Sequence, residues 1–125
     1  MAYQSFRELR VYQAARKLAV SIYEISGNGT LARDFGLRDQ IRRAAVSIGA
    51  NIAEGYERAT DRDFIRFLYI SKSSLSELQA HMDLAHDLRL IDETVYRSHD
   101  GQCESIKAML IKLIQARRGL KGRRV

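Results

Sequence analysis

The sequence predicts an all-α protein, an up-down-up-down antiparallel four-helix bundle, for three reasons. The 125 residues contain no proline, against about 5% on average, so nothing of that kind interrupts a long helix. Apolar residues recur at helical spacing in four long segments, and strict alternation typical of strands is not sustained. Short joins at 55–60 and 89–91 make successive helices antiparallel neighbours. We expect one domain, with the bundle over 1–118 and a basic tail over 119–125.

The first helix is predicted from about Phe6 to Ser26. Its inward positions are Val11, Ala15, Leu18, Ile22 and Ile25. Ser26-Gly27 followed by Asn28-Gly29 ends it, because glycine accepts the backbone conformation that terminates helices. The connection from Gly27 to Gly36 is the longest predicted loop, and we expect it to be mobile.

The second helix is predicted from about Leu37 to Glu54, stopping at Gly55. Its apolar stripe is Ile41, Ala45, Ile48 and Ile52. Small residues surround the stripe, namely Ala44, Ser47, Gly49, Ala50 and Ala53, and they allow another backbone to approach closely. Asn51 and Glu54 lie one turn apart, and we expect both to bond to the backbone of an adjoining loop or helix end.

Two capping patterns define the remaining helices. Thr60 with Asp63 forms a capping box for the third helix, which is predicted to reach about Leu88. Its inward stripe is Phe64, Leu68, Ser71, Leu75, Leu78, Met82 and Ala85. Asp92 is the predicted N-cap of the fourth helix, which is expected to end near Arg118 because Gly119 and Gly122 continue it poorly. That helix has the stripe Val95, His99, Cys103, Ile106, Leu110 and Leu113.

Small and apolar residues off these stripes predict further contacts. The serines of the third helix are Ser71, Ser73, Ser74 and Ser76, and we expect them to pack against the small residues of the second helix, with hydroxyls bonding back to the preceding turn. Additional apolar side chains widen the first and third helices: Tyr12, Ala19, Tyr23, Ile65, Tyr69 and Ile70. A second apolar face of this kind predicts a subunit interface.

The formal charge of +6 is concentrated at the C-terminus. The last nine residues hold five cations and no acid, which leaves 16 basic and 15 acidic side chains in residues 1–116. These cations, Arg117, Arg118, Lys121, Arg123 and Arg124, predict a segment that is disordered alone and attracts polyanions, with a solubilising tail as the alternative. Arg38, Arg42 and Arg43 form either a phosphate-binding patch or a solvated, salt-bridged surface in which Asp39 pairs with Arg42 or Arg43.

Catalytic and metal-binding patterns are weak. Asp83-x-x-His86, with Glu77 and His81 nearby, has no second such motif on another helix, so we expect no metal and no cofactor. Cys103 follows His99 by one turn but lacks an identifiable orienting partner, so we expect no enzyme and no small-molecule substrate. No signal peptide and no run of about 20 apolar residues is present, which predicts a cytoplasmic protein that does not engage a membrane.

Several segments together resemble one protein family. The run from Asp39 to Ile48, followed by Asn51-Ile52-Ala53-Glu54-Gly55, resembles the signature of the four-helix-bundle proteins named after 23S rRNA intervening sequences, also called S23 ribosomal protein-like. The resemblance continues in 6–12, 64–68 and 74–78, and so covers about the whole chain. In this resemblance Asn51, Glu54 and Gly55 are signature residues with a structural role.

The resemblance implies an assembly rather than a reaction. Proteins of this kind form ring-shaped pentamers, and related accessory proteins of diversity-generating retroelements bind nucleic acid and a reverse transcriptase. By analogy we expect a non-catalytic homopentamer that binds RNA or a ribonucleoprotein. The alternative is a purely structural adaptor whose ring presents a surface to a protein partner.

Overall fold

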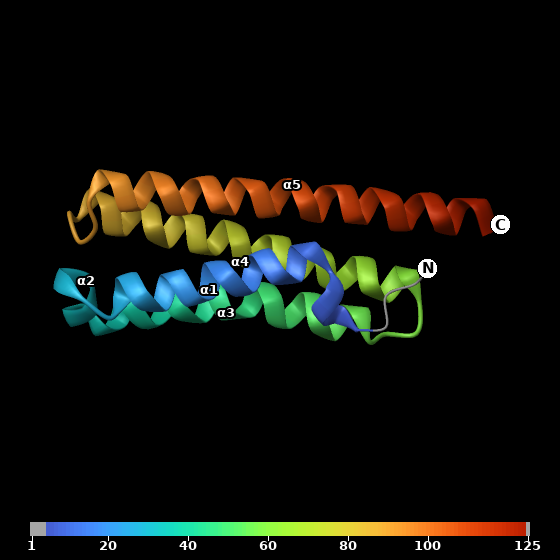
Figure 1. The fold of residues 1–125 in the computed structure, drawn as a ribbon, viewed down its shortest axis with the longest axis horizontal. Coiled ribbons are helices and arrows are strands. Elements are labelled where there is room, and N and C mark those ends of the chain that lie inside the picture. Colours follow the sequence, from blue (N-terminus) through green and yellow to red (C-terminus); the bar gives the residue numbers. More distant parts are fainter. Residues whose placement is uncertain (1–4, 125) are drawn as a thin grey trace.

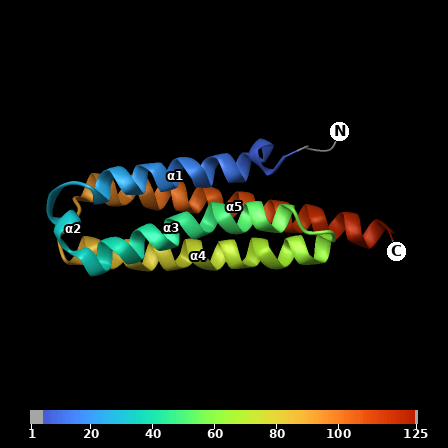
Figure 2. The ribbon, with the colours of Figure 1, turned by 90° about the horizontal axis from the view of Figure 1, so that it is seen from below.

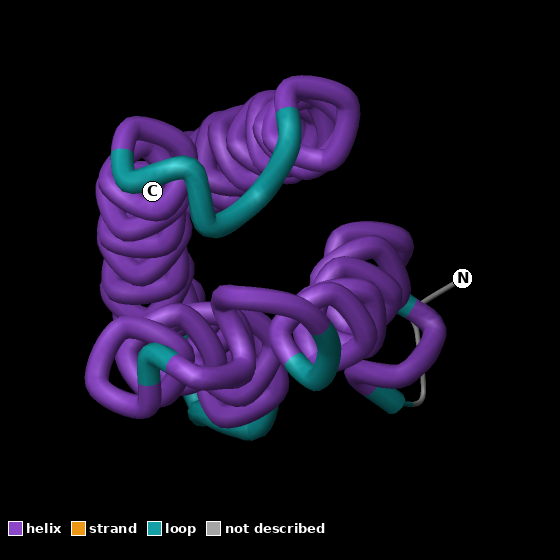
Figure 3. The backbone as a smooth tube through the Cα atoms, turned by 90° about the vertical axis from the view of Figure 1, so that its left-hand side faces the viewer, coloured by secondary structure: helices purple, strands orange, loops and turns teal. Residues whose placement is uncertain are grey.

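The computed structural model describes residues 5–124, with side chains described from 5 to 119. Its elements are η1 (Phe6–Glu8), α1 (Arg10–Ser26), α2 (Gly29–Arg33), α3 (Phe35–Tyr56), α4 (Asp61–Asp87) and α5 (Glu93–Arg124). The described residues form helices and loops without a strand (Figure 3). The prediction of an all-α protein is therefore confirmed for this part of the chain.

The four long helices run side by side, and each is antiparallel to the next along the chain (Figures 1 and 2). The contact between α3 and α4 is the most extensive, and α1 also packs on α3 and α4 on α5. Contact between α1 and α5 is the smallest of these four. Successive long helices therefore pack in antiparallel pairs, and the first and last long helices, α1 and α5, make the smallest contact of the four pairs.

The core is made by the predicted inward stripes. Every predicted inward residue of α4 is buried, as are Val11, Ala15, Leu18 and Ile22 of α1. Ile25 is only half-buried, and the adjacent Ser26 takes the buried position. In α5, Ile114 is buried where Leu113 was expected to be.

The segment between α1 and α3 differs from the prediction. The expected loop from Gly27 to Gly36 contains the short helix α2 instead. Leu31 is fully buried and attaches this helix to the core, and the Thr30 hydroxyl donates to the Leu90 carbonyl oxygen at 3.1 Å. One apolar residue at the centre of the segment is enough to order it against the neighbouring helices.

The ends of α3 also differ from the prediction. Asp34 caps its N-terminus by accepting a bond from the Leu37 N–H at 3.1 Å, so the helix begins before Leu37. At the other end Gly55 does not stop the helix but lies buried within it. A Cβ atom at Gly55 would stand 2.5 Å from Phe67 Cβ, and so the glycine permits close packing of α3 on α4.

The predicted caps of the last two helices are confirmed. Thr60 Oγ1 accepts from the Asp63 N–H at 3.1 Å, and Asp92 Oδ1 accepts from the Val95 N–H at 2.8 Å. The C-terminal end is different, because α5 continues to Arg124 rather than ending near Arg118. Its last turns extend past the other helices (Figures 1 and 2). The separation of a tail at residue 119 stays a prediction.

The serines of α4 join it to α3. Ser71 Oγ donates to the Ile48 carbonyl oxygen at 2.6 Å, and the hydroxyls of Ser74 and Ser47 lie 2.9 Å apart. The expected packing against the small residues of α3 is thus confirmed, but these hydroxyls bond across the interface and not back to their own helix. Ser73 and Ser76 are exposed and take no part in it.

Large apolar side chains remain exposed on the outer surface of the chain. Tyr23, Tyr69 and Ile70 are exposed as expected, whereas Tyr12, Ala19 and Ile65 are half-buried within the chain itself. Sequence reasoning missed other exposed apolar residues, among them Val20, Phe35, Val46, Leu84, Leu88 and Ile111. The second apolar face therefore spreads over more helices than predicted. None of the described helices is long and apolar enough to span a lipid bilayer.

Candidate nucleic-acid interface

Arg42 lies where α3 passes the C-terminus of α1. Its Nε donates to Ser26 Oγ at 2.7 Å and its Nη2 to the Tyr23 carbonyl oxygen at 3.2 Å. The guanidinium also lies 4.3 Å from the centre of the Tyr23 ring. The last carbonyl groups of a helix lack partners within that helix, and a cation that bonds to them is favourable. Arg42 of α3 thus binds to the C-terminal end of α1 and links the two helices.

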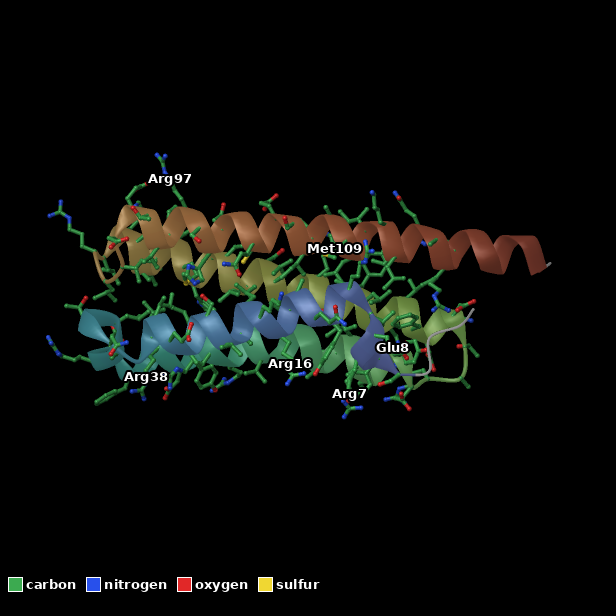
Figure 4. All side chains as sticks on the ribbon, viewed as in Figure 1. Arg7, Glu8, Arg16, Arg38, Arg97 and Met109 are labelled. Carbon is green, nitrogen blue, oxygen red and sulfur yellow. The ribbon has the colours of Figure 1, made fainter. Side chains whose placement is uncertain are left out.

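Its two predicted companions differ in their surroundings. Arg38 donates to the Ala32 carbonyl oxygen at 3.2 Å and pairs with Asp39 at 3.0 Å, at the α2 end of the molecule (Figure 4). The expected pairing of Asp39 with Arg42 or Arg43 is therefore wrong. Arg43 is exposed, and its guanidinium makes no hydrogen bond or ion pair within the described part of the chain. Of the three, Arg43 is the one most available to a phosphate.

The first two of the five C-terminal cations bind to α4. Arg117 Nη1 donates to Asp61 Oδ1 at 3.1 Å, and its guanidinium lies 5.0 Å from the centre of the Phe64 ring. Arg118 donates to the Tyr69 hydroxyl. Five unopposed cations were expected here, but Arg117 has an acidic partner. The side chains of Lys121, Arg123 and Arg124 lie outside the described residues.

Asn51 and Glu54 each bond to a residue four positions away along the chain, Asn51 to Ser47 within α3 and Glu54 to Arg58 just after it. Asn51 Nδ2 donates to Ser47 O at 2.8 Å and to Ser47 Oγ at 2.9 Å. Glu54 is 57% exposed and pairs with Arg58 at 3.5 Å. The expected bonds from Asn51 and Glu54 to an adjoining loop are thus replaced by contacts one turn away. Asn51 supports the serine contacts to α4, and Glu54 carries an exposed ion pair.

His99 and Cys103 are buried in a non-reactive arrangement. His99 Nδ1 lies 2.8 Å from the Val95 carbonyl oxygen, which can only accept, so Nδ1 carries the proton. In the neutral imidazole, Nε2 then accepts from the Ser21 hydroxyl, which lies 2.7 Å away. Burial, with a smaller contribution from Asp100, raises the pKa of the Cys103 thiol to about 12. Both nitrogens of His99 are occupied, and the thiol is held in its protonated, weakly nucleophilic form.

The other histidines pair with nearby carboxylates. His81 Nε2 lies 3.3 Å from Glu77 Oε2, and His86 Nε2 lies 2.7 Å from Glu93 Oε1. Asp83 accepts instead from the Tyr96 hydroxyl at 2.6 Å. Over the range that the structure describes, no three His, Cys, Asp or Glu side chains gather as a set of metal ligands.

Sequence reasoning missed most of the available positive charge. Several cations make no ion pair or side-chain hydrogen bond with any described residue: Arg10, Arg16, Lys17, Arg33, Arg43, Arg62, Lys72, Arg89 and Lys112. The sequence does not single them out, because acidic residues nearby along the chain are about as numerous as these basic residues and the net charge stays small. In the structure those acids point to other partners, for example Glu54 to Arg58 and Glu93 to Arg97.

The model of one protein family, the 23S rRNA-intervening sequence protein, matches residues 7–112. The chain belongs to this family. The match ends within α5, so Arg117, Arg118 and the cations after them lie beyond it. The cations without an ion pair or side-chain hydrogen bond in the described chain, from Arg10 to Lys112, lie inside the matched region.

A solved structure supports the same assignment. It is the crystal structure of a protein of unknown function from the S23 ribosomal protein family of Bacteroides thetaiotaomicron, 29% identical in sequence with a TM-score of 0.77. The similarity covers 83% of this chain and 97% of the other. No curated protein matches the chain. This member of the 23S rRNA-intervening sequence protein family thus shares its fold with a relative whose function is unknown.

Proposed function

We propose that the protein is a non-catalytic homopentamer that binds RNA or an RNA–protein assembly in the cytoplasm, without a cofactor or small-molecule substrate. Its four long helices are the up-down-up-down bundle that forms each unit of a ring. The observation that carries the proposal is the set of exposed cations that have no acidic partner in the described part of the chain, Arg43 among them. Phosphate groups are the natural partners of such cations, and a ring repeats the surface several times.

Exposed apolar residues support the oligomer. Phe35 is 65% exposed, Val20 56% and Leu88 53%. Large apolar side chains that are exposed in this way lose contact with water when a second copy of the chain packs on them. These residues lie on α1, α3 and the end of α4, so more than one face of the chain is suited to contact a second copy.

Equilibrium binding to RNA, DNA and heparin tests the proposal. We expect RNA binding that weakens between about 50 and 200 mM salt, because phosphate contacts release counterions. A preference for RNA that persists at the higher salt supports recognition of RNA. Equal binding to all three polyanions, abolished by salt, contradicts recognition and leaves a charge effect only.

The same exposed apolar residues favour a second function, that of an adaptor which presents its ring to a protein partner. An adaptor needs the oligomer but no affinity for nucleic acid. An intact oligomer that fails to bind RNA even at low salt therefore favours the adaptor over RNA binding.

A further inference from the structure

A groove follows the line where α1 and α5 meet. Because these helices make the smallest contact of the neighbouring pairs, the surface between them is hollowed. One hollow is lined from α1 by Ala14 and Lys17, and from α5 by Gly101, Gln102, Ser105 and Ile106. The next is lined by Leu9, Arg10, Val11, Met109, Lys112 and Leu113. We call these two hollows the α1–α5 groove; Met109 lies on the α1-facing side of α5 (Figure 4).

The groove is basic because its acidic neighbours turn away from it. Gln79 of α4 donates to Asp100 Oδ1 at 3.1 Å and to Glu104 Oε2 at 2.8 Å. Both carboxylates of this part of α5 are thus engaged on the α4 side. Neither hollow is lined by an acidic residue, whereas each is lined by at least one cation. Glu24 lies farther along α1, in a separate hollow that Lys17 also borders.

The cations of the groove are Arg10, Lys17 and Lys112. Arg10 and Lys112 line the same hollow from opposite helices. Lys17 is two helical turns from Arg10, about 10 Å along α1 at 1.5 Å per residue. All three are exposed, and none makes an ion pair within the described residues. This arrangement offers a line of positive charge with free donors on both walls.

We propose that the α1–α5 groove binds the phosphodiester backbone of a nucleic acid. The inference rests on the proposed function and identifies a surface for it that is distinct from Arg38, Arg42 and Arg43 and from the C-terminal cations. Gln102 and Ser105 add neutral hydrogen-bonding groups between the cations. No aromatic residue lines the groove, so it lacks the platforms on which bases stack. The contact is to phosphates and is independent of base sequence.

A pair of matched double variants tests the charge of the groove. Arg10→Gln with Lys112→Gln removes two groove cations. Arg66→Gln with Lys72→Gln removes one arginine and one lysine from α4. Arg66 pairs with Asp63 at 3.7 Å and Lys72 is half-buried, so neither belongs to the exposed cations without acidic partners. For a labelled single-stranded oligouridylate, the groove variant should lower the slope of log K against log salt by about 1.4, or 0.7 per lost contact. The α4 variant should leave that slope near the wild-type value.

Gly101 provides a second test that adds charge instead of removing it. It is exposed, and nothing lies within 4 Å of the position that a Cβ would take. Gly101→Ala should therefore fold normally and retain binding. Gly101→Glu places a carboxylate at the wall of the groove and should weaken binding relative to Gly101→Ala, with melting temperatures and oligomeric masses as checks on folding.

The outcomes separate this proposal from the proposed function. Groove-specific loss with the oligouridylate, with the corresponding DNA or with both supports the site and shows which backbone it takes. Equal loss in the groove and α4 double variants, together with unchanged binding by Gly101→Glu, overturns the groove while RNA binding itself stands. A wild-type protein that binds neither polymer overturns both.

Discussion

Two glycines of α3 differ in how much space a Cβ atom would have at their positions. At Gly55 a Cβ would lie 2.5 Å from Phe67 Cβ and 3.0 Å from Phe64 Cδ1, closer than packed atoms tolerate. At Gly49 the nearest atom would be Tyr12 Cε1 at 3.6 Å, an ordinary van der Waals contact. The signature position is thus the one where the interface of α3 with α4 requires the absence of a side chain.

Alanine at the two positions should have opposite effects. Gly55→Ala should cost about 1–3 kcal/mol through overpacking, beyond the helix-propensity gain. Gly49→Ala should be neutral or stabilise by up to about 1 kcal/mol, because alanine favours the helix and the space is sufficient. Urea denaturation of both variants measures the difference. Equal stabilities would show that α4 yields to the added methyl group.

Single residues were predictable where their partners lie close in sequence. Thr60 and Asp92 bond to N–H groups three residues on, and so the sequence revealed both caps. Arg42 bonds instead to Ser26 and Tyr23 on another helix, which no local pattern reveals. Glu54 was expected to bond to the backbone of an adjoining loop or helix end, but it is exposed on the helix surface and pairs with the Arg58 side chain.

The turn between α4 and α5 is held by a titratable pair. His86 Nε2 lies 2.7 Å from Glu93 Oε1, and the imidazole stacks on Tyr96 with ring centres 4.2 Å apart. The hydrogen bond with Glu93 raises the pKa of His86 above its ordinary 6.5, assisted by Asp87. The same bond, followed by that with Arg97, lowers the pKa of Glu93 below 4.5. Arg97 itself projects outward from α5 (Figure 4).

These pKa shifts predict a pH dependence of stability. Because the pKa of His86 is raised in the folded state, the contribution of this residue to the free energy of unfolding is complete below pH 6.5. That contribution is lost as the pH rises through the folded-state pKa. For Glu93, the contribution is present above pH 4.5 and is lost as the pH falls through its lowered pKa. The melting temperature should therefore decline on the alkaline side of 6.5, and His86→Gln should flatten this decline.

His81→Gln is the matched control, because it removes a histidine of the same helix and leaves the bond between His86 and Glu93 in place. If the melting temperature of His86→Gln depends on pH in the same way as that of the wild type, the pair of His86 and Glu93 does not stabilise the turn.

The C-terminal part of α5 predicts a difference between two truncations. A chain ending at Arg118 keeps the ion pair between Arg117 and Asp61, whose side chain is 9% exposed, and should be as stable as the full chain. A chain ending at Ala116 loses that pair and the Arg118 bond to Tyr69, and should be less stable by about 1–3 kcal/mol. Thermal denaturation compares them. Equal melting temperatures of the two truncated chains would show that Arg117 and Arg118 do not stabilise the fold.

Elements were predictable in proportion to their periodicity. The long helices repeat apolar residues over many turns, so their existence and order were clear from the sequence. The short α2 spans a single turn and offers no repeat. Buried Leu31 and the bond from Thr30 to the Leu90 carbonyl oxygen hold it in place. The end of α5 was placed too early because two glycines lower helix propensity without abolishing it.

At the scale of the whole molecule, surface charge and apolar exposure were the least predictable features. The sequence shows how many cations there are, but not which acids they meet. Lys107 pairs with Glu104 while Lys112, on the same helix, has no acidic partner in the described chain. Exposed apolar residues such as Phe35 and Leu88 likewise follow from how the helices are oriented, which only the fold determines.

Sedimentation velocity of the full-length protein with a labelled RNA tests the central claim, a homo-oligomer that binds RNA. We expect the protein to sediment with about five times the chain mass of 14.3 kDa, and the RNA label to move with it at an ionic strength of about 0.15 M. Protein that sediments at the mass of one chain, with the RNA label moving separately, would contradict both the assembly and its proposed function.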